Sequence, residues 1–263
     1  MRARVNGIEV FYRDEGKGAP IVLLHAFPLS GEMWRPQIDA LCDRFRVIAP
    51  DLRGFGRTEA PAGPYGLDAM AADVIALLDA LGVERFVLGG LSMGGYLAFA
   101  LLRRIDRSRV QGLLLADTRA EADTDDGRAN RLKMAARAET EGSGPIAEAM
   151  IGRLLGRTTI ETRPEVVERV KALIRENTGT GIAGAQRAMA ARPDSTALLG
   201  ELSMPALVLV GEEDPLTTPG DAAGMAAALP NARCATIPKA GHLSNLERPD
   251  AFNLYVADLL DRC

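Results

Sequence analysis

Short apolar segments alternate with longer amphipathic ones through the first half of the chain. Largely apolar runs that are typical of strands occur at Ile8–Arg13, Ile21–Leu24, Arg46–Ala49, Arg85–Gly89 and Val110–Ala116. Between them, Leu67–Leu81 carries apolar residues at helical spacing and Gly82 follows it, while Leu97–Arg104 continues a second helix. Short strands that alternate with helices predict an α/β fold, with a mostly parallel sheet flanked by helices on both faces.

The alternation stops between Asp117 and Leu198. This stretch is rich in Ala, Arg and Glu, and it predicts three or four helices without strands. Its expected turns are Gly142–Pro145, Arg163–Pro164 and Gly179–Gly181. The strand pattern returns at Ala206–Val210 and Arg233–Ile237, and a last helix is expected near Ala251–Leu260. We therefore predict one core domain from residues 1–117 and 198–263, with a helical insertion at 118–197.

Composition excludes several classes of protein. The 31 basic and 35 acidic residues nearly balance at a net charge of −4, so no basic face for nucleic acid is expected. The longest uncharged run, Phe86–Leu102, is short for a membrane span and contains four glycines. The chain has only two histidines and no Cys-x-x-Cys pair, which argues against a metal centre, and no cofactor is expected.

The cysteines bear on the compartment. Cys42, Cys234 and Cys263 lie far apart and form a poor disulfide framework. The N-terminus has no apolar signal core. We therefore expect a cytoplasmic protein.

Gly90-Leu91-Ser92-Met93-Gly94 fits the Gly-x-Ser-x-Gly pattern of a nucleophilic serine. It follows the strand Arg85–Gly89 and precedes a helix, which is the setting that the pattern requires. The glycines allow strand and helix to approach closely, and the turn directs the hydroxyl of Ser92 outward. The sequence therefore predicts that Ser92 is a catalytic nucleophile.

A serine nucleophile needs a base, and the base needs an acid to orient it. His242 lies on a loop after a strand and is the better base, whereas His25 directly follows a strand and is expected to orient the adjacent turn. The acid should lie on another strand-end loop. Asp214, after the strand Ala206–Val210, fits this position, and Asp117, after Val110–Ala116, is its rival.

These segments together resemble the α/β-hydrolase superfamily along nearly the whole chain. His25-Ala-Phe-Pro28 resembles the oxyanion loop of the family, although its second position is usually Gly, and Asp51–Gly56 resembles the turn after the next strand. Gly211–Asp214 and Gly241-His242 match the acid and base segments. The chain is most similar to small bacterial carboxylesterases, enol-lactonases and cofactor-free, haloperoxidase-like perhydrolases.

The resemblance implies an α/β-hydrolase fold in which the helical insertion caps the active site. It also implies that the backbone N–H groups of Phe27 and Met93 form the oxyanion hole. Pro28 favours extended backbone at Phe27, which would turn that N–H into the site, and Met93 begins a helix, where amides are unpaired.

The sequence favours hydrolysis of small, moderately apolar carboxylic esters. The insertion contains no aromatic residue, so its side of the pocket is expected to be aliphatic, and Leu29, Trp34, Leu216 and Leu243 are candidate pocket residues. An enol-lactonase remains open, with Arg119 or Arg128 as candidates for binding a substrate carboxylate. A perhydrolase and a slow-turnover ligand receptor also remain open. The expected partner is a small ester or lactone, and the sequence does not determine the oligomeric state.

Overall fold

A computed structural model describes residues 1–61 and 65–263 of the chain. Its described strands form one eight-stranded sheet in the order β1-β2-β4-β3-β5-β6-β7-β8. The first two strands pair antiparallel to their neighbours, and all other neighbours pair in parallel. The strands are β1 (Arg2–Val5), β2 (Ile8–Glu15), β3 (Pro20–Leu24), β4 (Arg46–Pro50), β5 (Phe86–Leu91), β6 (Val110–Ala116), β7 (Ala206–Gly211) and β8 (Ala232–Ile237).

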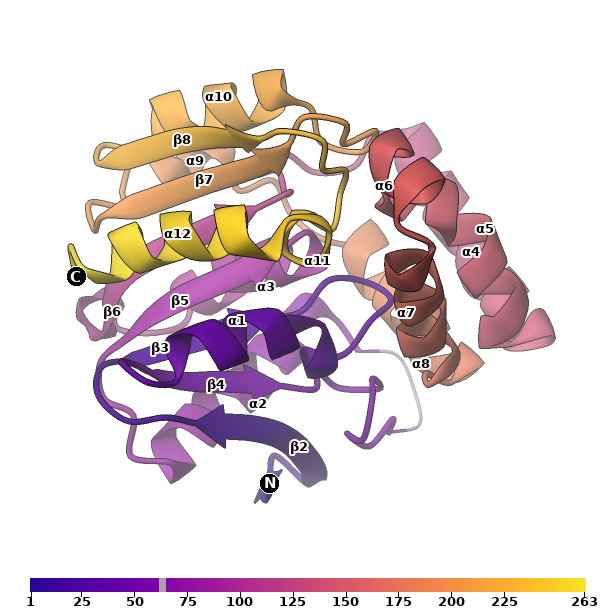
Figure 1. Cartoon of the computed structure of the whole chain (residues 1–263). Helices are drawn as coiled ribbons and strands as arrows, with labels where there is room; N and C mark the ends of the chain where they lie inside the picture. The colour runs from indigo at the N-terminus through magenta and orange to yellow at the C-terminus, as the bar shows by residue number, and fades with distance from the viewer. Residues whose placement is uncertain (62–64) are drawn as a thin grey trace.

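Helices cover both faces of this sheet, as the alternation of strands and helices predicts. In Figure 1, α1 and α12 lie on the face toward the viewer, whereas α2 and α3 lie behind the sheet. The helices outside the insertion are α1 (Arg35–Leu41), α2 (Leu67–Ala80), α3 (Met93–Leu102), α9 (Thr196–Leu199), α10 (Pro219–Ala228), α11 (Ser244–Glu247) and α12 (Pro249–Leu260). In the described part of the chain, two 3₁₀ turns lie at Gly31–Trp34 and Arg107–Arg109.

A helical insertion lies between β6 and β7, at one end of the sheet (Figure 1). It consists of α4 (Asp125–Glu141), α5 (Ser143–Leu154), α6 (Arg157–Thr162), α7 (Pro164–Arg175) and α8 (Gly179–Ala190). Because the chain enters it from the carboxyl end of β6, the insertion stands over the strand ends where ligands bind in open α/β sheets.

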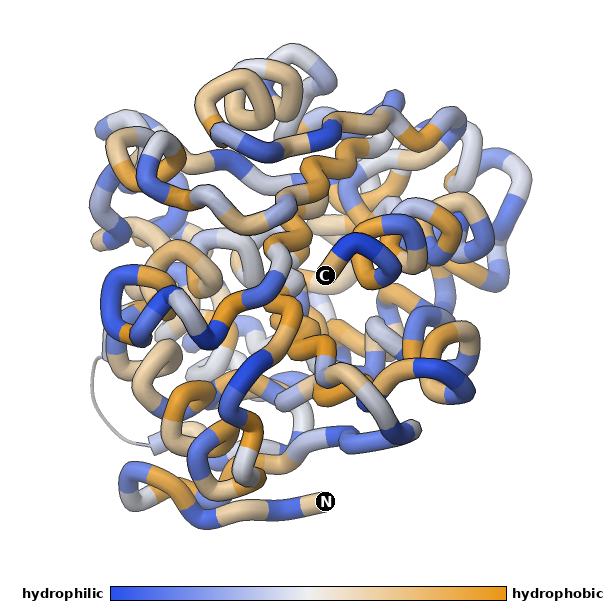
Figure 2. The backbone as a smooth tube through the Cα atoms, turned by 90° about the vertical axis from the view of Figure 1, so that its left-hand side faces the viewer, coloured by the Kyte–Doolittle hydropathy of each residue, from blue (hydrophilic) through white to orange (hydrophobic). Residues whose placement is uncertain are grey.

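The insertion shares one hydrophobic core with the sheet. Buried side chains such as Ile146, Leu173 and Ile182 of the insertion belong to the same cluster as the strands β3 and β5. Figure 2 shows hydrophobic segments passing through the middle of the molecule, with hydrophilic ones toward the outside. Continuous packing holds the insertion against the rim of the sheet, so residues of both parts can form one site.

The structure corrects two predicted turns of the insertion and adds a helix to it. Of the predicted turn Gly142–Pro145, only Gly142 lies between helices, because α5 begins at Ser143. Gly179–Gly181 is the first turn of α8, capped by the side chain of Thr178, not a loop. A Cβ atom on Gly179 would lie 2.1 Å from the carbonyl oxygen of Ala138, and one on Gly181 would lie 1.9 Å from that of Gly54. These glycines therefore permit close packing of α8 against its neighbours. In a single sequence, glycines that serve close packing look the same as glycines that form a turn. The insertion has five helices in its described residues, one more than the upper expectation.

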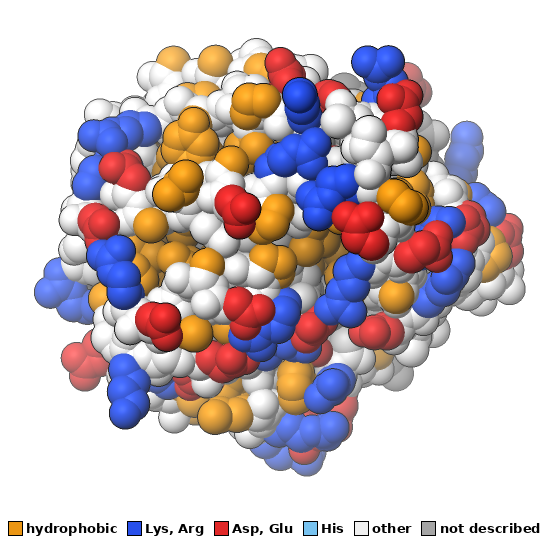
Figure 3. All heavy atoms as spheres, in the orientation of Figure 1, with side chains coloured by type: hydrophobic (Ala, Val, Ile, Leu, Met, Phe, Trp, Pro, Cys, Tyr) orange, Lys and Arg blue, Asp and Glu red, His pale blue; other side chains and the backbone are white. Residues whose placement is uncertain are grey.

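The surface shown in Figure 3 carries basic and acidic side chains that are interspersed, without a large patch of one sign. This mixture agrees with the nearly balanced charge of the chain. Within the described residues, no helix is both long and apolar enough to cross a membrane.

Candidate active site

Ser92 occupies a strained turn between β5 and α3. Its backbone has φ 55° and ψ −112°, a left-handed conformation that residues other than glycine rarely adopt. The turn is held on both sides, because the N–H of Ser92 donates to the Ala116 carbonyl at 2.9 Å and the Thr118 hydroxyl donates to the Ser92 carbonyl at 2.8 Å. Strain at this position lifts the hydroxyl away from the sheet, as in nucleophile elbows.

The two glycines of the motif are required by close contacts. A Cβ atom on Gly90 would lie 2.2 Å from the carbonyl oxygen of Gly94, and one on Gly94 would lie 2.1 Å from that of Leu24. Any side chain at either position would therefore push α3 away from β3 and β5. The two glycines of the Gly-x-Ser-x-Gly pattern are therefore required because α3 packs closely against β3 and β5.

Ser92, His242 and Asp214 lie in contact although they are far apart in the sequence. The Ser92 Oγ is 2.7 Å from Nε2 of His242, and Nδ1 of His242 is 2.8 Å from Oδ2 of Asp214. An ionised Asp214 can only accept a hydrogen bond, so Nδ1 of His242 carries the proton and Nε2 accepts from the serine hydroxyl. All three residues are buried.

The surroundings of Asp214 keep its carboxylate ionised. Burial by itself would raise its pKa, but the adjacent His242 and the hydrogen bonds from Thr217 and Leu216 outweigh burial and lower it below the usual range. The donors include the Leu216 N–H at 2.7 Å and the Thr217 N–H at 3.1 Å. Asp214 is therefore a fixed negative charge behind the imidazole.

Asp117, the rival acid, makes different contacts. Its carboxylate accepts hydrogen bonds from the Gly211 N–H at 2.8 Å and from the Ser244 hydroxyl at 2.5 Å, while the imidazole of His242 bonds to Asp214. Burial, together with the nearby charge of Asp214, raises the pKa of Asp117 well above its usual value. These contacts tie the ends of β6 and β7 to α11.

The amides of Phe27 and Met93 are both available for a ligand. Neither N–H donates a hydrogen bond to another group in the described part of the chain. Met93 is the first residue of α3, where the helix leaves its N–H groups unpaired and favours negative charge. Phe27 lines the same cavity as Ser92 and His242.

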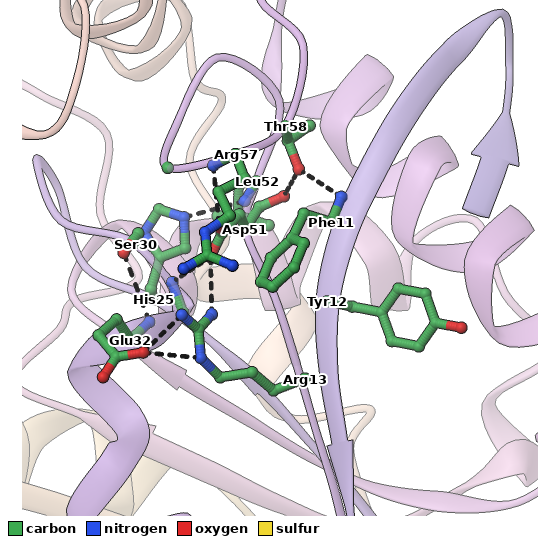
Figure 4. A network of polar contacts seen from close by, with 12 residues as sticks. Phe11, Tyr12, Arg13, His25, Ser30, Glu32, Asp51, Leu52, Arg57 and Thr58 are labelled. Carbon is green, nitrogen blue, oxygen red and sulfur yellow. Dashed lines mark hydrogen bonds and ion pairs between the residues drawn. The ribbon is translucent and has the colours of Figure 1, made fainter. Parts of the chain in front are cut away.

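Asp51 fixes the loop that carries Phe27. Its carboxylate, which is 1% exposed, accepts hydrogen bonds from the Gly31 N–H at 2.9 Å and the Arg57 N–H at 2.9 Å, and pairs with Arg13 at 3.1 Å. Figure 4 shows Arg13 extending from β2 toward Glu32 and this carboxylate. Arg53 does not join the network, since it pairs with Asp73 at 2.7 Å.

His25 joins the same loop to the turn after β4. Its Nε2 accepts from the Leu52 N–H at 3.0 Å, so its Nδ1 carries the proton and donates to the Ala26 carbonyl at 2.9 Å. Burial lowers the pKa of His25 to about 4, so the ring is neutral at physiological pH. This histidine therefore orients backbone, as expected, and both its nitrogens are occupied.

A cavity of about 160 Å³ lies above Ser92, between the sheet and the insertion. Its lining comes from core loops (Phe27, Ser92, Leu216 and His242) and from α4, α5 and α8 (Gly127, Asn130, Arg131, Met134, Met150, Arg153, Leu154, Gln186 and Met189). The volume is below the roughly 300–1,000 Å³ typical of pockets for drug-sized ligands, which favours a small substrate.

The lining differs from the sequence expectation in two respects. Of the four candidate pocket residues only Leu216 lines this cavity, because Leu29, Trp34 and Leu243 are fully buried in the core, where Trp34 packs against Phe252. The expected aliphatic wall is also wrong, since polar and basic side chains of α4, α5 and α8 accompany the methionines.

The basic residues of the lining are Arg131 and Arg153, which sequence reasoning missed. The expected arginines lie elsewhere: Arg119 lines a different pocket and Arg128 pairs with Asp125 at 3.2 Å. A signal for Arg153 exists in the sequence, because it follows Met150 by three residues and so falls on the same helix face.

No group of three or more His, Cys, Asp or Glu side chains is arranged to hold a metal ion in the part of the chain that the structure describes. A nucleophile elbow with imidazole and carboxylate partners, at the carboxyl ends of a parallel sheet, is the arrangement of the α/β hydrolases. Residues 19–249 match the family described as alpha/beta hydrolase fold. The chain therefore belongs to the alpha/beta hydrolase family, as its motifs predict.

Named relatives include both lactonases and esterases. The chain is 33% identical over 237 residues to 3-oxoadipate enol-lactonase 2 of Acinetobacter baylyi, which covers 88% of this chain and 84% of that protein. It is 43% identical to a thermophilic esterase from Thermogutta terrifontis, whose structure was solved with malate bound. The two structures superpose with a TM-score of 0.96, and the match covers 100% of this chain and 98% of the esterase. The enol-lactonase of Burkholderia xenovorans is 34% identical, with a TM-score of 0.91 over 99% of this chain and all of that one.

Proposed function

We propose that this protein is a serine hydrolase that cleaves carboxylic esters of small substrates through an acyl-enzyme. The observation that carries the proposal is the pair of contacts from Ser92 to His242 and from His242 to Asp214, at 2.7 and 2.8 Å, beside a small cavity. Similar proteins named as esterases and enol-lactonases support the same class of reaction.

In the proposed mechanism, His242 takes the proton of Ser92 while the serine oxygen attacks the ester carbonyl. The negative oxygen that forms accepts hydrogen bonds from the Phe27 and Met93 amides, each contributing about 3–4 kcal/mol to lowering the barrier. His242 then gives its proton to the leaving alcohol and afterwards activates water. Asp214 holds the imidazole in the required tautomer and stabilises its charged form.

The helical insertion takes the part of a cap in this proposal. Residues 118–197 would close one side of the cavity, and the core of 1–117 and 198–263 would supply the reacting groups. The three cysteines are unpaired in the described chain, which supports a reducing compartment such as the cytoplasm.

Labelling with a fluorophosphonate tests the nucleophile. We expect intact-mass analysis to find one adduct on the wild-type protein, and peptide mapping to place it on Ser92. The Ser92→Ala variant should not be labelled, and it should lose at least about 10⁴-fold in kcat for p-nitrophenyl acetate, because only the oxyanion hole remains. Wild-type protein that neither labels nor hydrolyses activated esters would overturn the proposal.

A matched pair of variants tests the acid. Asp214→Asn should lower kcat by about 10³-fold or more, because the wrong histidine tautomer results. Asp117→Asn should change kcat by less than about threefold, because Asp117 bonds to Gly211 and Ser244, whereas the imidazole of His242 bonds to Asp214. The reverse order would assign the acid to Asp117.

Hydrolysis of an enol-lactone is the second candidate function. Two of the similar proteins are named enol-lactonases and cover nearly the whole chain. A lactone uses the same nucleophile, base and oxyanion hole, and differs in that the leaving alcohol stays attached to the acyl group. Comparing kcat/KM for lactones with that for open-chain esters of the same acid separates the two candidates.

A further inference from the structure

Arg153 lies at the edge of the buried face of its helix, where it is exposed and also lines the cavity. Helix α5 buries Met150 and Leu154, and these two residues line the cavity. Arg153 follows Met150 by three residues, and residues three apart share one face of a helix, so Arg153 lies beside Met150. Because Arg153 is exposed and also lines the cavity, its guanidinium is accessible to a ligand that enters from solvent.

Among the described residues, the charge of Arg153 has no partner. Its guanidinium makes no hydrogen bond or ion pair with the described residues, although it lines the cavity. Other arginines on the insertion do pair, as Arg175 and Arg187 do with glutamates. A guanidinium without a partner beside a nucleophile is free to bind an anionic group of a ligand.

The charged residues near the cavity do not cancel the positive charge of Arg153. Arg131 also lines the cavity, and Asp123 binds both Arg131 and Arg192, the latter at 2.7 Å. Burial would raise the pKa of Asp123, but the two arginines outweigh it and keep the carboxylate ionised. Two positive charges thus share one negative charge, and no acidic side chain lines the cavity among the described residues.

This local excess of positive charge contrasts with the net charge of −4 of the whole chain. Field lines in a cleft lined by one sign of charge attract ligands of the opposite sign. The planar guanidinium fork matches a carboxylate in a bidentate arrangement, which makes arginine specific for that group. Methionines and Leu154 also line the cavity, so a short hydrocarbon chain that joins a carboxylate to an ester group would contact apolar side chains there.

We propose that the substrate carries a free carboxylate in addition to its ester or lactone group, and that Arg153 binds this carboxylate. Arg131, held by Asp123, adds positive charge to the same cavity. This inference rests on the proposed function, because it concerns what the same cavity selects. It makes Arg153 a specificity-determining residue and leaves the chemistry to Ser92 and His242.

Two pairs of esters test the inference, each with a charged and a neutral member of similar size. Monoethyl succinate and ethyl pentanoate differ on the acyl side, and 3-acetoxypropanoate and butyl acetate differ on the alcohol side. A pH-stat measures kcat/KM for all four without a chromophore. In at least one pair, the wild-type enzyme should prefer the charged ester by about tenfold or more, since a charge-assisted hydrogen bond contributes about that much.

In the Arg153→Ala variant, the ratio of kcat/KM for the charged ester to kcat/KM for the neutral ester should fall by about tenfold. Arg153→Glu should disfavour the charged ester further. Arg157→Ala is the matched control, because Arg157 is exposed on α6 and does not line the cavity. It should keep the wild-type preference. Because Arg153 is exposed, added salt should also reduce the preference of the wild type.

The outcomes separate the two proposals. If the wild type hydrolyses neutral esters but shows no charge preference in either pair, or if the preference survives in Arg153→Ala, the inference is overturned while the serine hydrolase stands. If the wild type cleaves none of the four esters and takes no fluorophosphonate label, both are overturned.

Discussion

Replacing His25 with Asn should change how the stability of the protein depends on pH. The imidazole is fully buried, and both of its nitrogens bond to backbone, at Leu52 and Ala26. Burial lowers its pKa to about 4 from the ordinary 6.5. Between these values the unfolded chain binds a proton that the folded protein excludes, so His25 destabilises the fold as the pH falls through this window.

The magnitude follows from the two pKa values. Relative to neutral pH, the titration of His25 costs the fold about 1.4 kcal/mol at pH 5.5 and about 2.6 kcal/mol at pH 4.5. Asp117 and Glu247 act in the opposite direction, because burial raises the pKa of each. Their contribution is common to wild type and variant and cancels in the difference.

Urea unfolding between pH 7.5 and 4.5 measures this difference, with the fluorescence of the single, buried Trp34 as the signal. At pH 7.5, His25→Asn should cost about 2–4 kcal/mol, because the Leu52 N–H loses its acceptor. The gap to the wild type should then narrow by about 2.6 kcal/mol at pH 4.5. Ile38→Val, in the buried core, should give a gap that stays constant. A constant gap for His25→Asn would refute the reasoning.

Two further predictions concern the framework of the site. Gly94→Ala should prevent α3 from packing against β3 and should destabilise the fold by more than about 4 kcal/mol. Gly152→Ala, whose added Cβ has nothing within 4 Å, should stabilise the fold by about 0.5–1 kcal/mol. Equal thermal midpoints for the two variants would contradict this prediction. Asp51→Asn should cost about 2–4 kcal/mol in urea unfolding, because Arg13 loses a buried partner and the loop of Phe27 loses its anchor; a change below about 0.5 kcal/mol would show that Asp51 does not hold that loop.

Much of the fold could be predicted because its signals are local. Buried parallel strands read as apolar runs, and those predicted at β3, β5 and β7 match the observed bounds within one or two residues. The sequence patterns did not predict β1, α1, α10 or the short helices α9 and α11. β1 has the polar sequence Arg2–Val5 of an exposed edge, and α10 is made mostly of small residues with little amphipathic contrast.

In the candidate site too, the residues with a local sequence signal were predicted and those without one were not. Ser92 sits in a short motif whose glycines are required by contacts with neighbouring segments, so the sequence carries the signal in five adjacent residues. The order of strand-end loops then favoured His242 and Asp214. The pocket prediction for Trp34 rested on its bulky side chain near the oxyanion loop, but both Trp34 and Leu243 are fully buried in the core.

The sequence by itself determined the α/β class, the elbow at Ser92 and the family, because each depends on residues that are neighbours in the chain. Only the tertiary structure decided that His242 bonds to Asp214 while Asp117 holds α11, since both acids end adjacent strands and differ only in where their loops lead. Only the tertiary structure also showed that Arg153, 61 residues from Ser92 in the sequence, lines the cavity. The reason is that packing of the insertion on the sheet determines which face of α5 lines the cavity above Ser92.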